Sequence, residues 1–578
     1  MTSHSNPPIS RATAIDTRQD IELAEGVTVH LLPAGPVPRA LAYAVDLCIR
    51  IGIYYVLGMA FAITSIAIGE AATGLMLITI FFMEWFYNVF FEISGRGATP
   101  GQRMMGLRVV SETGAAPTVG QSMLRNLLRT ADFIPIGYAL GAIVMLSTKR
   151  FQRLGDLAAR TLVVHQDKVD GEAQRRPMLP NSARSEPPPA EASPIPLNPE
   201  EARAILEFEA RLTSWTPERQ AEIAAHALPL LQGAASPVKR LRALARWLQN
   251  PHAVASPEAR WQKFDDWLSQ LERKSNKKAK NLPPPPATPW VELPALFRQV
   301  CADLALARQR CLSPLTVERL NNLCLRGCQH LYGGQGAMRA GVWRFVGETF
   351  PRAVRSEWKI VSWCHFLFWF PFLTLLFFGD RDPRWFESTL GADGMQSLHQ
   401  MYDDREAVAG ARDSLGENFA MFGHYIWNNV GICFRTFAGG LLLGVGALLI
   451  TIFNGIHIGA AAGYVTHAAD PVAFWTFVAG HAAFELTGIV LSAVAGLRMG
   501  LAIIAPGAMT RREALGAAGE RAFPILIGAA MLVVAAAFIE GFWSPLDFPP
   551  IVKYSFGIAL WLLTAIYFIF SGRKRSLS

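Results

Sequence analysis

The sequence predicts an all-α, multi-pass membrane protein, with two helical membrane domains joined by a soluble, mainly helical segment. Only 17% of the 578 residues are charged and 51% are hydrophobic, whereas a soluble domain has about 25% charged residues. Long apolar runs raise the mean hydropathy to +0.23. This composition argues against a cytosolic globular protein. The net charge of +8 is typical of basic cytoplasmic loops, so we expect no nucleic-acid binding.

The positions of the apolar runs predict the membrane spans. A bilayer core about 30 Å thick needs about 20 apolar residues in a helix. Two such runs lie near the N-terminus, at 40–68 and 71–93. A polar leader precedes the first run, so we expect a retained anchor and not a cleaved signal peptide. Five further apolar blocks follow in the second half, at 360–378, 430–464, 472–496, 523–539 and 554–570.

Basic residues predict the orientation of these spans, because cytoplasmic loops carry an excess of Lys and Arg. Basic loops flank a short apolar piece at 134–147, so a re-entrant or interfacial helix is favoured there and a span stays the alternative. The acidic loop 379–417 is expected outside. The basic residues of the other loops predict an inner-membrane protein with both termini in the cytoplasm; they are Arg498, Arg511, Arg512, Arg521, Arg573, Lys574 and Arg575.

The stretch 430–470 needs a more complex path than one span. Passing from outside near Glu417 to inside near Arg498 requires an odd number of crossings, but only two apolar blocks lie between them. We therefore expect an additional crossing or a re-entrant pair in this stretch. Its hinge is predicted at Asn454–Gly455, where small and polar residues interrupt the apolar run.

The middle of the chain is predicted to be soluble. Residues 176–200 are dense in Pro and polar residues and predict a disordered linker. Apolar residues at three- and four-residue spacing then predict amphipathic helices. The domain boundaries that follow are 1–38 (leader), 39–165 (membrane domain), 166–200 (linker), 201–289 (cytoplasmic helices ending in a basic, Pro-rich linker), 290–358 (cytoplasmic and juxtamembrane helices), 359–571 (membrane domain) and 572–578 (tail).

The first membrane domain resembles the RDD family, which is named for one arginine and two aspartates. Arg39 stands at the start of the first span, Asp46 lies two turns into it, and Asp156 fits the second aspartate. The segments TPGQRMMGLRVVSETG (99–114) and QRLGDLAARTLVV (152–164) carry the rest of the resemblance. The resemblance implies a helical membrane domain with minor β-structure in its loops.

The C-terminal part, from about Trp290 to Pro545, resembles the stage II sporulation protein M family. The resemblance rests on the pieces FPRAVR (350–355), FNGIHIG (453–459), GHAAFEL with the downstream AGLRMG (480–500), and AAAFIEGFWSP (535–545). It implies a polytopic cytoplasmic-membrane protein. Neither resemblance implies a settled biochemical activity.

Charged residues in the first two spans are candidate functional groups. A charge near the centre of a membrane helix costs about 2.5–3.5 kcal/mol on insertion scales, so it should face protein, water or another charge. Asp46 and Arg50 lie four residues apart and Arg39 seven before Asp46, which predicts one charged face with an ion pair. Glu84 and Glu92 lie in the second span. An ion-pair network that fixes packing is favoured over a proton or cation path.

The second membrane domain carries its own polar residues. His481 and Glu485 lie four residues apart and share one helix face, while Arg498 is expected to cap the end of that helix. The remaining candidates are Arg435, Asn454 and Glu540. A zinc site would need a third ligand from His424, His457, His467 or Glu540. The order HAAFE is not the metalloprotease signature, so a structural or gating role is favoured over translocation or metal catalysis.

Three hypotheses for function follow, and the preferred one requires no cofactor and no resident metal. The preferred one is a non-enzymatic membrane protein in envelope organisation or in a transport assembly, with the bilayer, protein partners on 201–358 and a homo-oligomer as its associations. The alternatives are a cation, proton or lipid transporter using Asp46, Glu84 and the His481–Glu485 face, and an intramembrane metalloenzyme. Cys324, Cys328 and His330 have poor zinc spacing and predict buried thiols.

Overall fold

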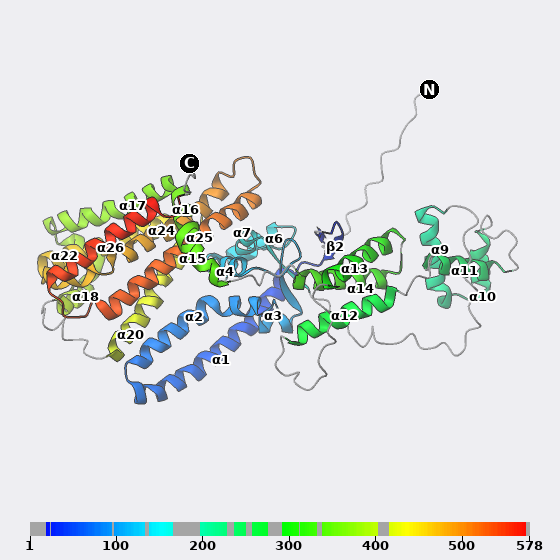
Figure 1. Cartoon of the computed structure of the whole chain (residues 1–578), viewed down its shortest axis with the longest axis horizontal. Coiled ribbons are helices and arrows are strands. Elements are labelled where there is room, and N and C mark those ends of the chain that lie inside the picture. The colour runs from blue at the N-terminus through cyan, green and yellow to red at the C-terminus, as the bar shows by residue number, and fades with distance from the viewer. Residues whose placement is uncertain are drawn as a thin grey trace, which may run out of the picture.

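The computed structural model describes residues 19–573 except 24, 95–96, 133–137, 166–196, 228–235, 250–256, 275–291, 311, 332–337 and 403–414. Figure 1 shows a helical membrane body at one end of the long axis and soluble helices at the other. The predicted linkers, in 166–196 and 275–291, lie outside the described residues, and so do Lys574 and Arg575.

The N-terminal membrane region contains a long helical hairpin and two small antiparallel sheets. β1 pairs with β2 and β3 with β4, with Leu107 opposite His165. The predicted minor β-structure is therefore present. The elements are β1 (Gln19–Glu22), β2 (Thr28–Leu31), α1 (Pro36–Ile68), α2 (Ala71–Ile93), α3 (Pro100–Met104), β3 (Leu107–Ser111), α4 (Val119–Leu127), α5 (Arg129–Asp132), α6 (Ala139–Ser147), α7 (Leu154–Ala159) and β4 (Thr161–His165).

The soluble helices form two separate cores. One core joins α9 to α11, where Ile205, Phe208 and Leu244 are buried. The other joins α12–α14 and also takes in Val29 of β2 and Ala115, so it rests on the N-terminal region. The elements are α9 (Pro199–Arg211), η1 (Leu212–Ser214), α10 (Pro217–Ala225), α11 (Pro237–Gln249), α12 (Pro257–Lys274), α13 (Glu292–Gln309) and α14 (Pro314–Leu331).

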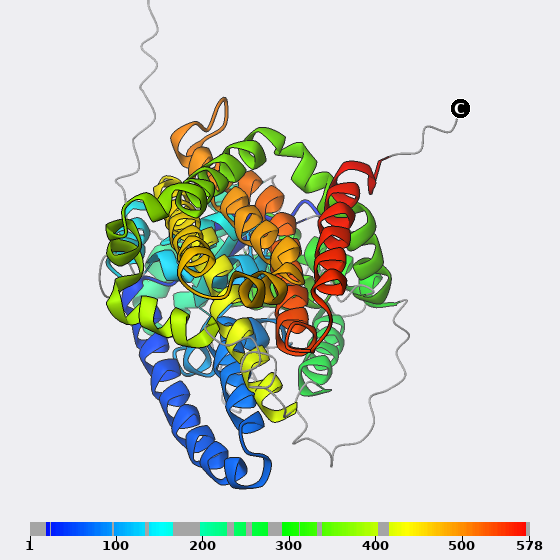
Figure 2. The same ribbon diagram turned by 90° about the vertical axis from the view of Figure 1, so that its left-hand side faces the viewer.

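The C-terminal region is a helical bundle interrupted by three π-turns. Figure 2 shows α26 along one edge of this bundle and the α1–α2 hairpin projecting at another. Its elements are α15 (Met338–Arg344), η3 (Phe345–Thr349), α16 (Phe350–Ser356), α17 (Trp358–Phe378), η4 (Gly379–Arg381), α18 (Arg384–Tyr402), α20 (Leu415–Tyr425), η5 (Ile426–Val430), α21 (Gly431–Gly439), α22 (Val445–Ala468), α23 (Pro471–Ala479), α24 (Ala482–Ile504), α25 (Arg511–Phe538), η6 (Ile539–Trp543) and α26 (Pro550–Phe570).

The expected membrane spans are confirmed by length and composition. Within the described residues, seven helices are apolar and long enough to cross a bilayer, two in the N-terminal region and five in the C-terminal region. The short piece at 134–147 is different. Its helix, α6, has nine residues and is about 14 Å long at 1.5 Å per residue, which is too short to cross a bilayer.

The hinge predicted at Asn454–Gly455 is wrong. Both residues lie inside the continuous helix α22, and the chain turns instead between Gly439 and Val445, where Leu443 and Gly444 have positive φ. Gly455 faces α17, where a methyl group would lie 2.4 Å from the Phe368 carbonyl oxygen. The small residue therefore serves helix packing and not a break, because small residues let helices approach closely in membranes.

A further long helical stretch before Arg498 begins ahead of the apolar block 430–464 and ends inside it. α20, η5 and α21 follow one another from Leu415 to Gly439 with helical backbone angles at both junctions. At 1.5 Å per residue this stretch is long enough to cross the bilayer core. Together with α22 and the α23–α24 pair, it would make three passages before Arg498. The additional crossing within 430–470, and the orientation from which it follows, stay predictions.

Glycine contacts pack the N-terminal hairpin against the C-terminal bundle. A methyl group on Gly74 of α2 would lie 2.3 Å from the carbonyl oxygen of Phe419, and one on Gly423 of α20 would lie 2.5 Å from that of Gly74. Only glycine permits this approach of two backbones. The two membrane regions therefore form one body.

A second contact between the two membrane regions is made by the N-terminal part of α25. Gly519 approaches the Ala158 carbonyl of α7, where a methyl group would lie 2.6 Å from the oxygen. Arg160 pairs with Glu520 at 3.0 Å, and Arg512 pairs with Glu112. The N-terminal turns of α25 thus pack against α7 and pair with Arg160 and Glu112 of the N-terminal region.

A protease site inserted between residues 166 and 196 tests this packing. After cleavage in detergent, we expect the two membrane fragments to elute together, because the backbone contacts at Gly74 do not depend on chain continuity. Gly74→Leu should reduce the retained N-terminal fragment by about half or more, since the larger side chain separates α2 from α20.

Gly58→Leu is the matched control, because nothing lies within 4 Å of a methyl group at this position of α1. It should leave the fragments together. Separation of the wild-type fragments immediately after cleavage would contradict the packing described above.

Candidate functional site

A buried charge network lies where α1, α2, α4 and α7 meet. Arg125 of α4 binds Glu92 of α2 at 2.8 Å and also binds Asp156 of α7. Asp156 forms a second ion pair with the Arg39 guanidinium at 2.5 Å and a third with Arg153 at 3.4 Å. The side chains of Glu92 and Asp156 are fully buried. Three arginines therefore compensate two carboxylates across four helices.

Electrostatic compensation decides the charge of each carboxyl in this network. Burial alone would raise the pKa of Asp156, but the guanidinium groups of Arg39, Arg125 and Arg153 outweigh it and hold that pKa below its usual range. Asp132 faces Arg153 at 3.6 Å, and burial raises its pKa to about 6. Asp156 is thus held ionised, while Asp132 binds its proton more tightly.

Asp46 fixes a backbone turn instead of pairing with Arg50. Its carboxylate accepts hydrogen bonds from the Thr99 hydroxyl at 2.5 Å and from the Gly101 amide at 2.8 Å, at the N-terminus of α3. A carboxylate at a helix N-terminus satisfies backbone donors that have no partner in the helix. No ion pair between Asp46 and Arg50 occurs in the described part of the chain, so the expected pair is wrong.

The remaining candidates of the first two spans lie in different surroundings. Arg50 is buried, with its guanidinium 5.4 Å and 5.7 Å from the ring centres of Tyr43 and Tyr87, an arrangement in which an aromatic face replaces a carboxylate. Glu84 is exposed on the outer face of α2. The structure therefore brings Arg39 and Asp156 together and leaves Asp46, Arg50 and Glu84 outside the network.

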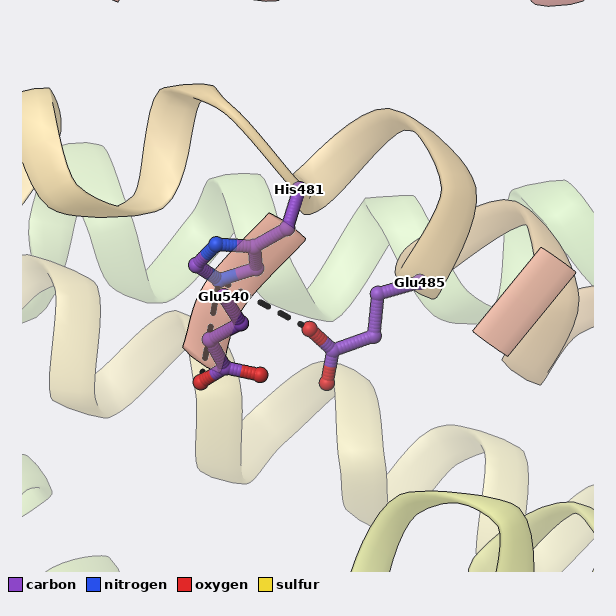
Figure 3. Close-up of side chains that lie close together, drawn as sticks. All are labelled: His481, Glu485 and Glu540. Carbon is purple, nitrogen blue, oxygen red and sulfur yellow. Dashed lines mark ion pairs between the residues drawn. The ribbon is translucent and has the colours of Figure 1, made fainter. Parts of the chain in front are cut away.

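A second polar cluster lies inside the C-terminal bundle. The imidazole Nε2 of His481 is 3.7 Å from a carboxylate oxygen of Glu485 and 3.9 Å from one of Glu540. One ligand-type atom from each residue lies within 4.8 Å of the other two. Figure 3 shows the three side chains converging from separate turns. Of the four third partners considered from the sequence, the structure selects Glu540.

Local breaks in the helices create this convergence. The apolar block 472–496 is divided, because α23 ends at Ala479 and α24 begins at Ala482, with His481 at its N-cap. Gly480 lets Trp543 approach, since a methyl group there would lie 2.4 Å from the indole. Glu540 lies on the π-turn η6, and single π-turns are frequent at functional sites.

Neutral and cationic groups surround the cluster. The Asn429 amide of η5 donates to Glu485 Oε1 at 2.9 Å. The Ser544 hydroxyl lies 3.2 Å from His481 Nδ1, and the Lys553 ammonium donates to the Ser544 carbonyl at 2.9 Å. The Glu485 carboxylate and the His481 imidazole thus have hydrogen-bond partners that orient them, as buried polar groups require.

Among the described residues, the other three candidates of the C-terminal region make their contacts outside this cluster. Arg435 is exposed on α21, and the Asn454 amide donates to the Ile450 carbonyl within α22. Arg498 pairs with Glu357 at 3.3 Å. The expectation that Arg498 caps the end of its helix is wrong, because α24 continues to Ile504.

The cysteines of the soluble helices are buried thiols, as predicted. Cys301, Cys324 and Cys328 are all buried in the core of α12–α14. A hydrogen bond with Cys301 and burial raise the pKa of Cys324, and burial raises the pKa of Cys328 to about 12. Protonated thiols are poor metal ligands.

Sequence reasoning missed several residues of both sites. Arg125 and Arg153 belong to the basic loops on either side of 134–147, where their charge indicates orientation and not a site, and no local pattern singles out Asp132. Asn429 and Lys553 stand at the edges of apolar blocks, and this position is the one signal that could have singled them out. Nothing in a local pattern indicates Ser544.

Substitution of Asp156 tests the charge network. Asp156→Asn leaves Arg125 buried with fewer compensating charges, and breaking such a buried pair costs about 3–5 kcal/mol. We expect a clearly lower thermal unfolding midpoint at pH 7. Because the pKa of Asp156 is held low, its contribution is complete above about pH 4 and is lost below it. The difference between variant and wild type should therefore shrink below pH 4.

Asp382→Asn is the control, since this carboxylate pairs with Arg384 on the protein surface. Its unfolding midpoint should match that of the wild type. An Asp156→Asn variant as stable as the wild type at pH 7 would show that the network does not hold the helices together.

Comparisons with known proteins divide the chain in the same way as its geometry. Residues 33–160 match the model of the RDD family, and residues 364–545 match that of stage II sporulation protein M. Residues 254–333, which include α12–α14, match a domain of unknown function, DUF8413, so the second resemblance, expected from Trp290, covers a shorter stretch.

One curated relative and the solved structures complete the comparison. An uncharacterized protein of Methanocaldococcus jannaschii is 26% identical over 126 residues, which cover 22% of this chain and 71% of that protein. No solved structure matches the chain. The chain thus joins two membrane-protein families in one polypeptide, with an RDD-family region at 33–160 and a stage II sporulation protein M family region at 364–545.

Proposed function

We propose that this multi-pass membrane protein is a non-enzymatic scaffold of the cell's inner membrane, acting in envelope organisation or in a membrane transport assembly. One observation carries the proposal: the two family regions pack into a single membrane body through the Gly74 and Gly423 contacts. A body of this kind holds attached soluble domains at a fixed place on the membrane surface.

The arrangement of charged ends supports cytoplasmic soluble helices. Arg498 of α24 binds Glu357, and Arg355 donates to the Phe568 carbonyl near the end of α26. Arg512 at the start of α25 binds Glu112. The helix α16, which carries Arg355, lies on the side of the body toward α12–α14 (Figure 1). Because cytoplasmic ends are enriched in Lys and Arg, this charge supports a cytoplasmic position for this end.

The soluble helices supply the surface for protein partners. The α9–α11 core is separate from the membrane body, and Leu315 at the start of α14 is 80% exposed. The scaffold proposal therefore assigns partner binding to 201–358, with another protein or a second copy of this chain as the partner.

Photo-crosslinking in native membranes tests this assignment. A photoreactive phenylalanine analogue at Leu315 should give a discrete protein adduct, whose mass distinguishes a second copy from another protein. The same analogue at Ile66, which is 87% exposed on the apolar helix α1, should give lipid adducts. Absence of any protein adduct at exposed positions of α9–α14 would contradict the scaffold.

Ion transport is the second candidate, and the buried His481–Glu485–Glu540 cluster favours it. Ionisable groups inside a membrane domain are commonly part of ion or proton paths, and broken helices around a polar site occur in transporters. The structure gives this candidate no support from Asp46, which holds α3, or from Glu84, which is exposed.

Flux measurements in proteoliposomes test this candidate. If the cluster conducts protons or cations, Glu485→Gln should abolish a wild-type flux while the protein still folds and inserts. His457→Gln, which removes a histidine stacked on Phe453 of α22, should leave the flux unchanged. A wild-type protein without flux of protons or monovalent cations, or an active Glu485→Gln variant, would exclude this function.

A further inference from the structure

The three side chains of the polar cluster have the donor set and spacing of a metal site. One imidazole nitrogen faces two carboxylate oxygens at 3.7 and 3.9 Å. Two ligands bound tetrahedrally at about 2.0–2.1 Å from zinc lie about 3.3–3.4 Å apart. Shifts of a few tenths of an ångström would therefore bring the donors to binding distance. The third pair of donor atoms, one from each carboxylate, lies within 4.8 Å and needs a larger side-chain rotation to reach this spacing.

Burial makes the negative charge of this cluster costly without a cation. His481 is 4% and Glu540 is 8% exposed, and the side chain of Glu485 is 16% exposed. Two ionised carboxylates at this depth need compensation. A divalent ion between the three side chains would neutralise both carboxylates at once.

The surrounding groups orient the donors as the outer groups of a metal site do. The Ser544 hydroxyl contacts His481 Nδ1, so Nε2 is the nitrogen that faces the carboxylates. Asn429 donates to one oxygen of Glu485 and leaves the other toward His481. Hydrogen bonds of this kind fix the ring tautomer and orientation of metal-binding histidines.

We propose that His481, Glu485 and Glu540 bind one divalent transition-metal ion of the zinc type. The imidazole favours such an ion over Mg²⁺ or Ca²⁺, which prefer oxygen donors. Three protein ligands leave a fourth position for water or another ligand. The ion joins the α23–α24 break to η6 and is independent of both proposed functions, since binding requires neither a partner nor flux.

Zinc binding by the full-length protein in detergent tests the site. After chelator treatment, titration with Zn²⁺ should saturate at one ion per chain and raise the thermal unfolding midpoint. Glu540→Gln and His481→Gln should each weaken binding by about tenfold or more. X-ray absorption should give nitrogen and oxygen ligands at about 2.0–2.1 Å, without sulfur at about 2.3 Å.

Matched variants separate this site from other histidines and cysteines. His457→Gln and Cys324→Ser remove potential ligands elsewhere and should leave zinc affinity unchanged. Ser544→Ala keeps all three donors but frees the imidazole, and it should weaken binding about tenfold; it decides the case if a ligand variant does not fold. Failure to saturate near one ion, sulfur ligation, or wild-type affinity in both Glu540→Gln and Ser544→Ala would overturn the proposal.

Discussion

Compensation of charge inside apolar surroundings is the constraint on which this architecture depends. In lipid, an ionised side chain persists only where another group balances it. In the N-terminal region, Arg125 meets this demand by binding Glu92 and Asp156 from two different helices. In the C-terminal region, His481 and Glu485, which lie four residues apart, meet Glu540 of the π-turn η6. Each cluster therefore specifies which helices lie next to one another, which apolar packing alone would specify less strictly.

The sequence predicted the membrane spans well because their signal is local. Apolar length and basic loops each occupy a short window, and the seven spans follow from them. The hinge prediction at Asn454–Gly455 was wrong because glycine occurs both where a helix breaks and where two helices pack closely. The sequence does not show that the Phe368 carbonyl lies against Gly455, and this contact identifies helix packing. The passage through Leu415–Gly439 was expected from parity, but its polar first half concealed its position.

The candidate sites were only partly predictable, since their partners depend on how the helices are placed. His481 and Glu485 share a helix face in any helical arrangement, so their proximity follows from spacing. Their contact with Glu540 depends on the π-turn η6, and no residue pattern predicts the extra residue that such a turn contains. Asp46 lies where it was expected, yet its partners are Thr99 and Gly101, which belong to a loop about fifty residues later.

The helix α25 spans the distance between the two halves of the molecule. Gly519 near its start touches α7, and the chain continues without interruption into η6, which carries Glu540. One helix therefore contacts the RDD-family region near its start and leads directly to a carboxylate of the buried polar cluster at its end, so the position of Glu540 depends on how α25 packs against α7.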